Sequence, residues 1–418
     1  MEENLMYDIR DKVTADRAGI DPLSKSHLGE HLPGDTVEIR EQLPTPMLTW
    51  DTDSLVSNIT EMARWAAEKR VLLAPHGKTT MTPDLWKAQL ATGAVGITVA
   101  NAAQARVAAA HQVPLIIVGN EFLTPPGLRW LRDITAAPGP EVMCWVDSLE
   151  AVELMGQALA GTGRPVQVCV ELGIPGRRAG VRDDAQISPI VHAIREADGL
   201  SFAGFSGFEG VLPKERVDEV RSFLERMGAL LERFVQEIET ETPVVTAGGG
   251  LYFDLVAEVL TPVAQRCGDA RVIVRSGAYL LHDHLHYERL TPRVTRGDGP
   301  SLTPAAILWT RVLSRPEEDL AILDAGKRDF AYDITLPRPL RVHRADGTVE
   351  ELAKAEIFDS NDQHGYLRCH GEGLQVGDLV ELGQAHPCTI ADKWRDILLV
   401  TRTSPHQLRW DAVLRTCF

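Results

Sequence analysis

The sequence has no excess of positive charge and no long apolar run. Its 418 residues carry 43 lysines and arginines against 59 aspartates and glutamates, for a formal net charge of −16. Nucleic acids and anionic membrane surfaces bind basic patches, so neither is expected as a partner. No apolar run approaches the ~20 residues of a membrane-spanning helix. The acidic start, residues 1–4, lacks the basic and then apolar order of a signal peptide, so we expect a cytoplasmic protein.

Cysteine is scarce as well. The six cysteines are scattered and include no Cys-x-x-Cys pair. Cys144, Cys169 and Cys267 lie in or near apolar stretches and are predicted to be reduced residues of the core. This agrees with a cytoplasmic location.

A glycine-rich fingerprint is missing after the first strand-like run, and this bears on the fold. From residue 70 to about 280, short β-rich runs alternate with segments of helical periodicity. Eight such units in succession predict an α/β protein with a (β/α)8 TIM-like barrel, and a doubly wound open sheet is the main alternative. The eight runs are 71–74, 95–99, 115–118, 141–146, 166–171, 202–206, 243–246 and 272–275.

The pattern changes beyond about residue 290, where shorter β-like runs are separated by turns and not by long helices. We predict a small C-terminal all-β domain after the barrel. The chain is long enough for one large and one smaller domain. The predicted divisions are an N-terminal extension, the barrel and the β-domain, at 1–45, 46–290 and 291–418.

Candidate functional residues follow the strands, where a barrel places its chemistry. Lys78 comes after the first run, at a turn where its side chain can point into a pocket. A desolvated lysine loses its proton more easily, and the neutral amine can form a Schiff base with an aldehyde. Three glycines, 248–250, follow the seventh run, where backbone N–H groups can converge on a phosphate. Pyridoxal phosphate requires both a lysine and a phosphate site.

Four segments occur in the order of a known family: Pro-His-Gly-Lys-Thr at 75–79, Arg-Ala-Gly at 178–180, the glycines at 248–250, and Ser-Gly-Ala-Tyr at 276–279. From about residue 45 to 405 the chain resembles the alanine-racemase-type (fold type III) pyridoxal-phosphate enzymes, in particular the branch of D-serine dehydratase and D-threonine aldolase. The resemblance implies that Lys78 carries the cofactor, that Arg178 lies beside the ring hydroxyl, and that two loops hold the phosphate. The cofactor-binding residues it implies are Lys78, His76, Arg178, Gly248, Gly249, Gly250, Ser276, Gly277, Ala278 and Tyr279.

The resemblance also implies a metal site in the β-domain. His386 and Cys388 match the His-x-Cys pair that binds zinc in the D-serine dehydratase branch. On an extended segment, residues two apart point to the same face, so both side chains can reach one ion. Imidazole and thiolate suit Zn²⁺, whereas the His-x-Asp pair of an aldolase would suit Mn²⁺ or Mg²⁺. His364 resembles a catalytic neighbour, and the alternating histidines at 282, 284 and 286 are interpreted as surface or second-shell groups.

The implied function is that of a pyridoxal-phosphate- and zinc-dependent dehydratase. It would convert a D-3-hydroxy amino acid into a 2-oxo acid and ammonia, with Lys78 removing the Cα proton and the metal binding the β-hydroxyl. D-Serine is the default substrate, and D-threonine or a 3-hydroxyaspartate are alternatives. Family members with this architecture are usually head-to-tail dimers, so we expect a homodimer.

Three alternatives differ in chemistry. A D-threonine-type aldolase would release glycine and an aldehyde, and the His-x-Cys pair counts against it. A non-catalytic pyridoxal-phosphate carrier would lack the β-domain. A metal-dependent barrel hydrolase is disfavoured because the strand ends carry no His-x-His pair and no carboxylate cluster.

Overall fold

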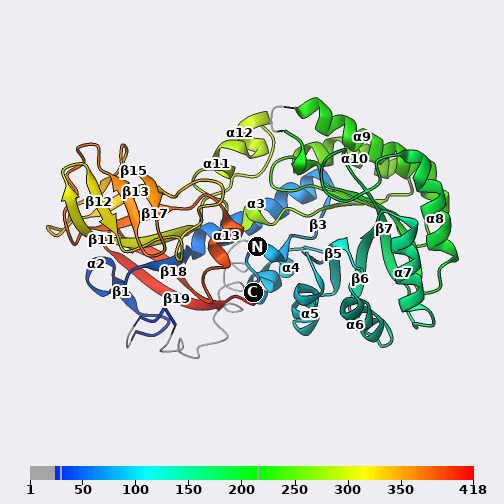
Figure 1. The fold of residues 1–418 in the computed structure, drawn as a ribbon, viewed down its shortest axis with the longest axis horizontal. Helices are drawn as coiled ribbons and strands as arrows, with labels where there is room; N and C mark the ends of the chain where they lie inside the picture. Colours follow the sequence, from blue (N-terminus) through cyan, green and yellow to red (C-terminus); the bar gives the residue numbers. More distant parts are fainter. Residues whose placement is uncertain (1–23, 29–30, 214–215) are drawn as a thin grey trace.

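A computed structural model describes residues 24–28, 31–213 and 216–418 and shows a barrel beside a β-rich domain (Figure 1). Residues 1–23, which make up about half of the expected N-terminal extension, lie outside the described residues. The short helices α11 (Tyr287–Leu290) and α12 (Pro292–Arg296) lie on the connection from the barrel to the β-rich domain. Within the described ranges, no helix is both long and apolar enough to cross a membrane.

Eight parallel strands form the barrel, as the alternating pattern predicts. Neighbouring strands follow the order β3-β10-β9-β8-β7-β6-β5-β4, and a parallel bridge between His76 and Thr98 brings the end of the first strand beside β4. The carboxyl ends of all eight strands therefore meet at one mouth. The strands are β3 (Leu72–Leu73), β4 (Ile97–Val99), β5 (Leu115–Glu121), β6 (Glu141–Val146), β7 (Val166–Leu172), β8 (Leu200–Gly207), β9 (Val244–Ala247) and β10 (Arg271–Val274).

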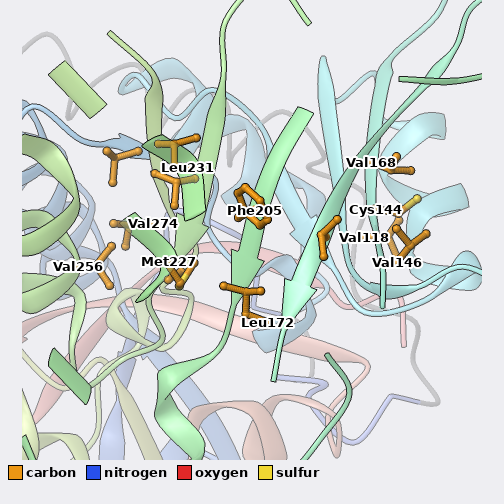
Figure 2. Close-up of a cluster of buried hydrophobic side chains, with 14 of the residues drawn as sticks. Val118, Cys144, Val146, Val168, Leu172, Phe205, Met227, Leu231, Val256 and Val274 are labelled. Carbon is orange, nitrogen blue, oxygen red and sulfur yellow. The ribbon is translucent and has the colours of Figure 1, made fainter. Parts of the chain in front are cut away.

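Helices cover the outside of the barrel and bury their apolar faces against the strands. In α9 (Val217–Phe234), Leu224, Met227 and Leu231 recur at helical spacing and are fully buried. Figure 2 shows Met227 and Leu231 in one cluster with Phe205 of β8. The other outer helices are α3 (Thr52–Lys69), α4 (Pro83–Ala91), α5 (Ala102–Ala110), α6 (Pro125–Thr135), α7 (Leu149–Leu159), α8 (Ile187–Glu196) and α10 (Phe253–Arg266).

The strand side chains that alternate with those of the outer cluster form a second, smaller cluster inside the barrel. Ile116 and Val118 of β5 belong to the outer cluster, whereas Ile117 belongs to the inner one, together with Trp145 and Cys169. Successive strand residues point to opposite faces, so the inner cluster fills the barrel beneath its mouth. The strands are thus buried on both faces, which explains why they read as continuous apolar runs.

The β-rich domain is built around an 11-stranded sheet, and its first two strands come from the N-terminal part of the chain. β1 (Thr36–Glu38) pairs with β19, and β2 (Met47–Asp51) pairs with β11 and β18. The sequence assigned these residues to the extension and to the start of the barrel. The remaining strands are β11 (Ala306–Glu317), β12 (Leu320–Leu323), β13 (Arg338–His343), β14 (Val349–Glu351), β15 (Glu356–Ser360), β16 (Gly365–Arg368), β17 (Leu379–Gly383), β18 (Asp396–Ser404) and β19 (Gln407–Arg415).

One short helix of this domain reaches the barrel mouth. The chain leaves β17 at Gly383 and forms α13 (Pro387–Ala391), which packs against the turn η1 (Gly77–Thr79). The segment that carries His386 and Cys388 is therefore brought beside Lys78.

Candidate active site

Lys78 lies at the barrel mouth, a few residues beyond β3. It is the middle residue of η1, a single 3-10 turn. A Cβ at Gly77 would lie 2.6 Å from Ile97 and 2.8 Å from Trp86, so the turn has no room for a side chain before the lysine. The Lys78 side chain is exposed. This exposure differs from the desolvated lysine considered from the sequence.

A small cavity of about 80 Å³ opens beside Lys78. It brings together five of the predicted cofactor residues, which follow three separate strands, β3, β7 and β9. A larger cavity of about 580 Å³ lies in the β-domain and contains none of the predicted site residues. The small cavity is lined by His76, Lys78, Gly119, Glu171, Arg178, Phe208, Gly248, Gly249 and Arg275.

His76 contributes a neutral imidazole to this cavity. Burial, together with the positive charges of Lys78, Arg275 and Arg178, lowers the pKa of His76 well below its usual value. Its Nδ1 has no hydrogen-bond partner in the part of the chain that the structure describes. A neutral ring with a free nitrogen can form a hydrogen bond to a bound ligand.

Arg178 supplies the cation at the opposite wall. Its guanidinium carbon lies 5.4 Å from the centroid of the Phe208 ring. Its Nη2 lies 4.0 Å from Glu171 Oε1 and donates to the Gly119 carbonyl oxygen at 3.5 Å. The guanidinium is thus held at the cavity, where it can meet an anionic group or a ring hydroxyl.

The two glycine loops at the end of β9 and β10 form a cradle with some free amides. The N–H groups of Gly248 and Gly249 already donate to the buried Glu209 carboxylate, both at 3.0 Å. Among the described residues, Gly250, Gly277 and Ala278 donate no backbone N–H group within the protein. The amides of Gly248 and Gly249 are therefore occupied, and of the three glycines predicted to hold the phosphate only Gly250 keeps a free amide for it.

The packing of the protein itself requires glycine in both loops of the cradle. A Cβ at Gly250 would lie 2.3 Å from the Tyr287 ring, and one at Gly277 would lie 2.5 Å from the His76 carbonyl oxygen. Ser276 donates its hydroxyl to the Gly249 carbonyl, which ties the two loops together. Free amides in a glycine-lined concavity beside a cation match a phosphate. The residues present thus fit pyridoxal phosphate.

Tyr279 contributes only its backbone to this cradle. Its ring is buried in the core around the barrel, and its hydroxyl accepts a hydrogen bond of 2.8 Å from Gln89. Burial raises the pKa of the Tyr279 phenol, so the hydroxyl is neutral. The Tyr279 side chain is therefore not available for a direct contact to the cofactor.

Two residues near the cavity were missed by the sequence argument. Arg275 is 7% exposed, and its guanidinium donates to Thr246 Oγ1 at 2.6 Å and to the Gly207 carbonyl at 2.7 Å. Its place directly after β10 was a signal that could have identified it. Tyr287 packs against Gly250 and lies within electrostatic reach of Cys388. Its sequence context gave no such signal.

His386 and Cys388 do come together, but not on an extended segment. His386 precedes α13 and Cys388 lies in its first turn, so the strand geometry expected from the sequence is wrong. The two side chains are hydrogen-bonded to each other, and the Cys388 thiol donates to Thr79 Oγ1 at 3.5 Å. Because Thr79 follows Lys78 directly, the pair lies beside the lysine turn. Imidazole and thiol are donors that suit Zn²⁺, but no group of three or more His, Cys, Asp or Glu side chains able to hold a metal occurs among the described residues, so this pair supplies only two ligands.

The electrostatics of the pair favour a thiolate. Burial alone would raise the pKa of Cys388, but hydrogen bonds from His386 and Thr79 and the charges of His386 and Lys78 lower it below its usual value. Burial likewise opposes the charged form of His386, yet Cys388 and Asp333 raise the pKa of His386 to about 9. A thiolate is the form of cysteine that ligates metals.

Asp333 is the third member of this group. Its Oδ2 lies 2.5 Å from His386 Nδ1, and the Thr389 hydroxyl lies 3.0 Å from the same nitrogen. With Nδ1 occupied by these two partners, Nε2 is the nitrogen left for an ion. Asp333 was not predicted from the sequence, because it precedes the pair by more than fifty residues.

The other predicted histidines have different outcomes. His364 lies in the turn between β15 and β16, and its role as a catalytic neighbour stays a prediction. His282 is only 6% exposed, so it is not a surface group, and the alternative that it supports the site from behind the ligands stays a prediction. Burial lowers the pKa of His282 to about 4, and burial with the nearby charge of Arg338 does the same for His284. Both are neutral imidazoles.

Comparison with known proteins matches this architecture in two parts. Residues 50–254 match the alanine racemase N-terminal domain, and residues 305–400 match a serine dehydratase domain. The chain belongs to the fold type III pyridoxal-phosphate enzymes. The predicted family and the fold of a barrel followed by a mostly-β domain are thereby confirmed.

Relatives of this fold type III enzyme include both kinds of lyase. It is 26% identical over 400 residues to D-threonine aldolase of Arthrobacter sp., covering 92% of this chain and 95% of the relative. It is 26% identical over 357 residues to D-threo-3-hydroxyaspartate dehydratase of Delftia sp. strain HT23, covering 81% and 86%. The prediction of a pyridoxal-phosphate-dependent lyase is confirmed.

Solved structures show the same fold. The crystal structure of D-threonine aldolase from Filomicrobium marinum has a TM-score of 0.76 at 24% identity, covering 93% of this chain and 98% of that one. The Delftia dehydratase has a TM-score of 0.69 at 20% identity, covering 91% and 99%. Solved variants of a D-threo-3-hydroxyaspartate dehydratase include a histidine-to-alanine replacement and, two positions further on, a cysteine-to-alanine replacement solved in the metal-free form.

Proposed function

We propose that this enzyme is a zinc-dependent dehydratase that uses pyridoxal phosphate to convert D-3-hydroxy amino acids into 2-oxo acids and ammonia. The observation that carries the proposal is the contact between His386 and Cys388 beside the turn that bears Lys78. A histidine and a cysteine with the same spacing were replaced in solved variants of a D-threo-3-hydroxyaspartate dehydratase, and the cysteine variant was solved in a metal-free form. That similarity favours a metal ion at His386 and Cys388.

The chain's own residues account for the steps at the substrate. Pyridoxal phosphate, when bound, supplies the electron sink for a carbanion at Cα. Lys78 is placed to bond the cofactor aldehyde and, once displaced by the substrate amine, to take the Cα proton at Nζ. Zn²⁺, when bound to His386 and Cys388, supplies a Lewis acid for the β-hydroxyl. Arg178 holds an anionic group or the ring hydroxyl at the opposite wall, and Gly250, Gly277 and Ala278 offer amides for the phosphate.

A D-threonine-type aldolase is the second candidate, because the Arthrobacter relative aligns with 92% of this chain. Both candidates act on D-3-hydroxy amino acids and differ in the bond that breaks, Cβ–O or Cα–Cβ. The thiolate ligand favours dehydration, because Cys suits Zn²⁺ whereas a carboxylate would suit a harder ion. D-Serine is the proposed substrate, with D-threonine and 3-hydroxyaspartate as alternatives.

The proposal is tested on the purified protein by its metal content and its visible spectrum. We expect zinc in a ratio of about one per chain and an absorption band that shifts on addition of D-serine and not of L-serine. Isolation without any transition metal, combined with turnover that a chelator leaves unchanged, would remove the metal from the proposal. A homodimer and a cytoplasmic location are proposed on the family resemblance alone, and sedimentation and cell fractionation test them.

Asp333→Asn gives a prediction that does not depend on turnover. The asparagine keeps the size of the side chain but removes the carboxylate that faces His386 Nδ1. We expect the affinity for Zn²⁺ to fall about 10–100-fold, while binding of pyridoxal phosphate is unchanged. Competition with a chromophoric chelator measures the affinity. Asp362→Asn, at a carboxylate 70% exposed on the surface, is the matched control, and equal affinities in the two variants would contradict the role of Asp333.

A further inference from the structure

Two glutamates face each other at the edge of the cofactor cavity, and the mechanism above uses neither. Glu121 ends β5, and Glu171 is the second-to-last residue of β7, so they flank the central strand β6 at the barrel mouth. Glu171 is 2% exposed and lines the cavity. The two carboxyl groups are within hydrogen-bonding distance of each other.

The pair has few other partners. Glu121 Oε1 and Glu171 Oε2 are buried and accept no hydrogen bond from an N–H or O–H donor of the other described residues. The cation nearest to the pair is Arg178, whose Nη2 lies 4.0 Å from Glu171 Oε1. The same nitrogen donates to the carbonyl of Gly119, two residues before Glu121. One guanidinium therefore lies beside the Glu171 carboxyl group and the end of β5, the strand that carries Glu121.

Simple chemistry fixes the charge of such a pair. A carboxylate has no hydrogen to donate, so two carboxyl groups can share a hydrogen bond only when one of them is protonated. Two buried carboxylates in contact would also repel each other strongly. One proton between the two oxygens removes the repulsion and leaves a single negative charge.

We propose that Glu121 and Glu171 share one proton at neutral pH and act together as a singly charged counterion that positions Arg178 at the cofactor cavity. The inference rests on the proposed function for the role of Arg178 as the cofactor contact, but not for the state of the pair. The pair then carries one negative charge. The charges of the buried Arg275 and Glu209 cancel each other, so Lys78 and Arg178 together outweigh the pair and leave the site with a net positive charge. That balance suits an anionic cofactor and the carboxylate of an amino acid substrate.

Three charged or titratable groups surround the pair. Arg178 lies near it on the segment after β7, Arg275 directly after β10, and the neutral thiol of Cys144 on β6. Burial and the contact with Glu121 raise the pKa of Glu171 to about 8. The folded pair thus keeps a proton that free glutamates release near pH 4.3. The stability that this proton contributes is fully present at low pH, declines as the pH rises above about 5, and is lost once the pH passes 8.

Thermal unfolding of the cofactor-loaded protein between pH 5.5 and 8.5 tests the shared proton. Glu171→Gln keeps the hydrogen bond, because its amide can donate to Glu121, and it has no proton to lose. We expect its melting temperature, relative to the wild type, to rise by roughly 3–6 °C across this range. Glu121→Gln should behave in the same way. Glu150→Gln, at an exposed glutamate on α7, should show no trend.

A second variant tests the link to Arg178. The positive charge of Arg178 favours ionisation of the pair. In an Arg178→Gln variant that keeps both glutamates, the pH at which stability declines should therefore rise by roughly one unit relative to the wild type. If the Glu171→Gln difference is constant with pH, the pair is not protonated and the proposal is wrong. If the trend appears but Arg178→Gln does not move it, the pair does not serve Arg178. Both outcomes are independent of turnover, so they do not depend on whether the enzyme is a dehydratase.

Discussion

Replacing Lys78 by alanine should abolish the visible band of bound pyridoxal phosphate and lower turnover by at least about 10³-fold. The lysine has two roles in this account, because its Nζ bonds the aldehyde and later takes the Cα proton. Its position in η1, between the cavity and the His386–Cys388 pair, serves both. Difference spectroscopy after addition of the cofactor measures the first role, and single-turnover kinetics measure the second.

The control for this prediction is Lys87→Ala. Lys87 lies on the outside of α4 and forms an ion pair of 3.0 Å with Asp84 on the same helix. We expect the spectrum and turnover of this variant to match those of the wild type. A Lys78→Ala variant that kept the lysine-bound band would mean that another amine holds the cofactor, and the site would have to be placed elsewhere.

Replacing Cys388 by alanine should remove the metal without removing the cofactor. The thiol is one of two proposed protein ligands, and its pKa is lowered by His386, Thr79 and Lys78 against the effect of burial. We expect the affinity for Zn²⁺ to fall by at least about 10²-fold and formation of the 2-oxo acid to fall with it. The visible band of pyridoxal phosphate should persist, because Cys388 is not among the residues that line the cavity.

Two further variants make this result specific. Cys417→Ala removes a partly exposed cysteine from the end of the chain and should leave metal and turnover unchanged. Cys388→Asp creates a His-x-Asp pair, whose harder oxygen ligand should shift the preference from Zn²⁺ towards Mn²⁺. Undiminished zinc binding by the Cys388→Ala variant would contradict the proposed ligand set.

The barrel could be predicted from the sequence because its strands are buried on both faces. Such strands read as short apolar runs, and the run at 141–146 coincides with β6 (Glu141–Val146) residue for residue. The partner of a run is harder to predict. Met47–Asp51 is as apolar as a barrel strand, yet it pairs with β11 and β18 of the other sheet. A run of five residues does not carry information about which sheet it joins.

The sequence indicated those residues of the candidate site whose own side chain would perform the chemistry. Lys78 and Arg178 line one cavity and Cys388 contacts Thr79, although Pro387 begins a helix where an extended segment was expected. The roles of these residues stay predictions. Residues that act through a contact were not predictable. Asp333 reaches His386 across more than fifty residues, and Glu209 occupies two amides that the glycine pattern assigned to phosphate. Only the folded chain brings such partners together.

The most direct test of the central claim is to identify the products formed from D-serine and D-threonine by the cofactor-loaded enzyme. The account predicts a 2-oxo acid and ammonia in equal amounts, loss of both on treatment with a chelator, and their return when Zn²⁺ is added. Glycine together with an aldehyde would contradict it and identify an aldolase.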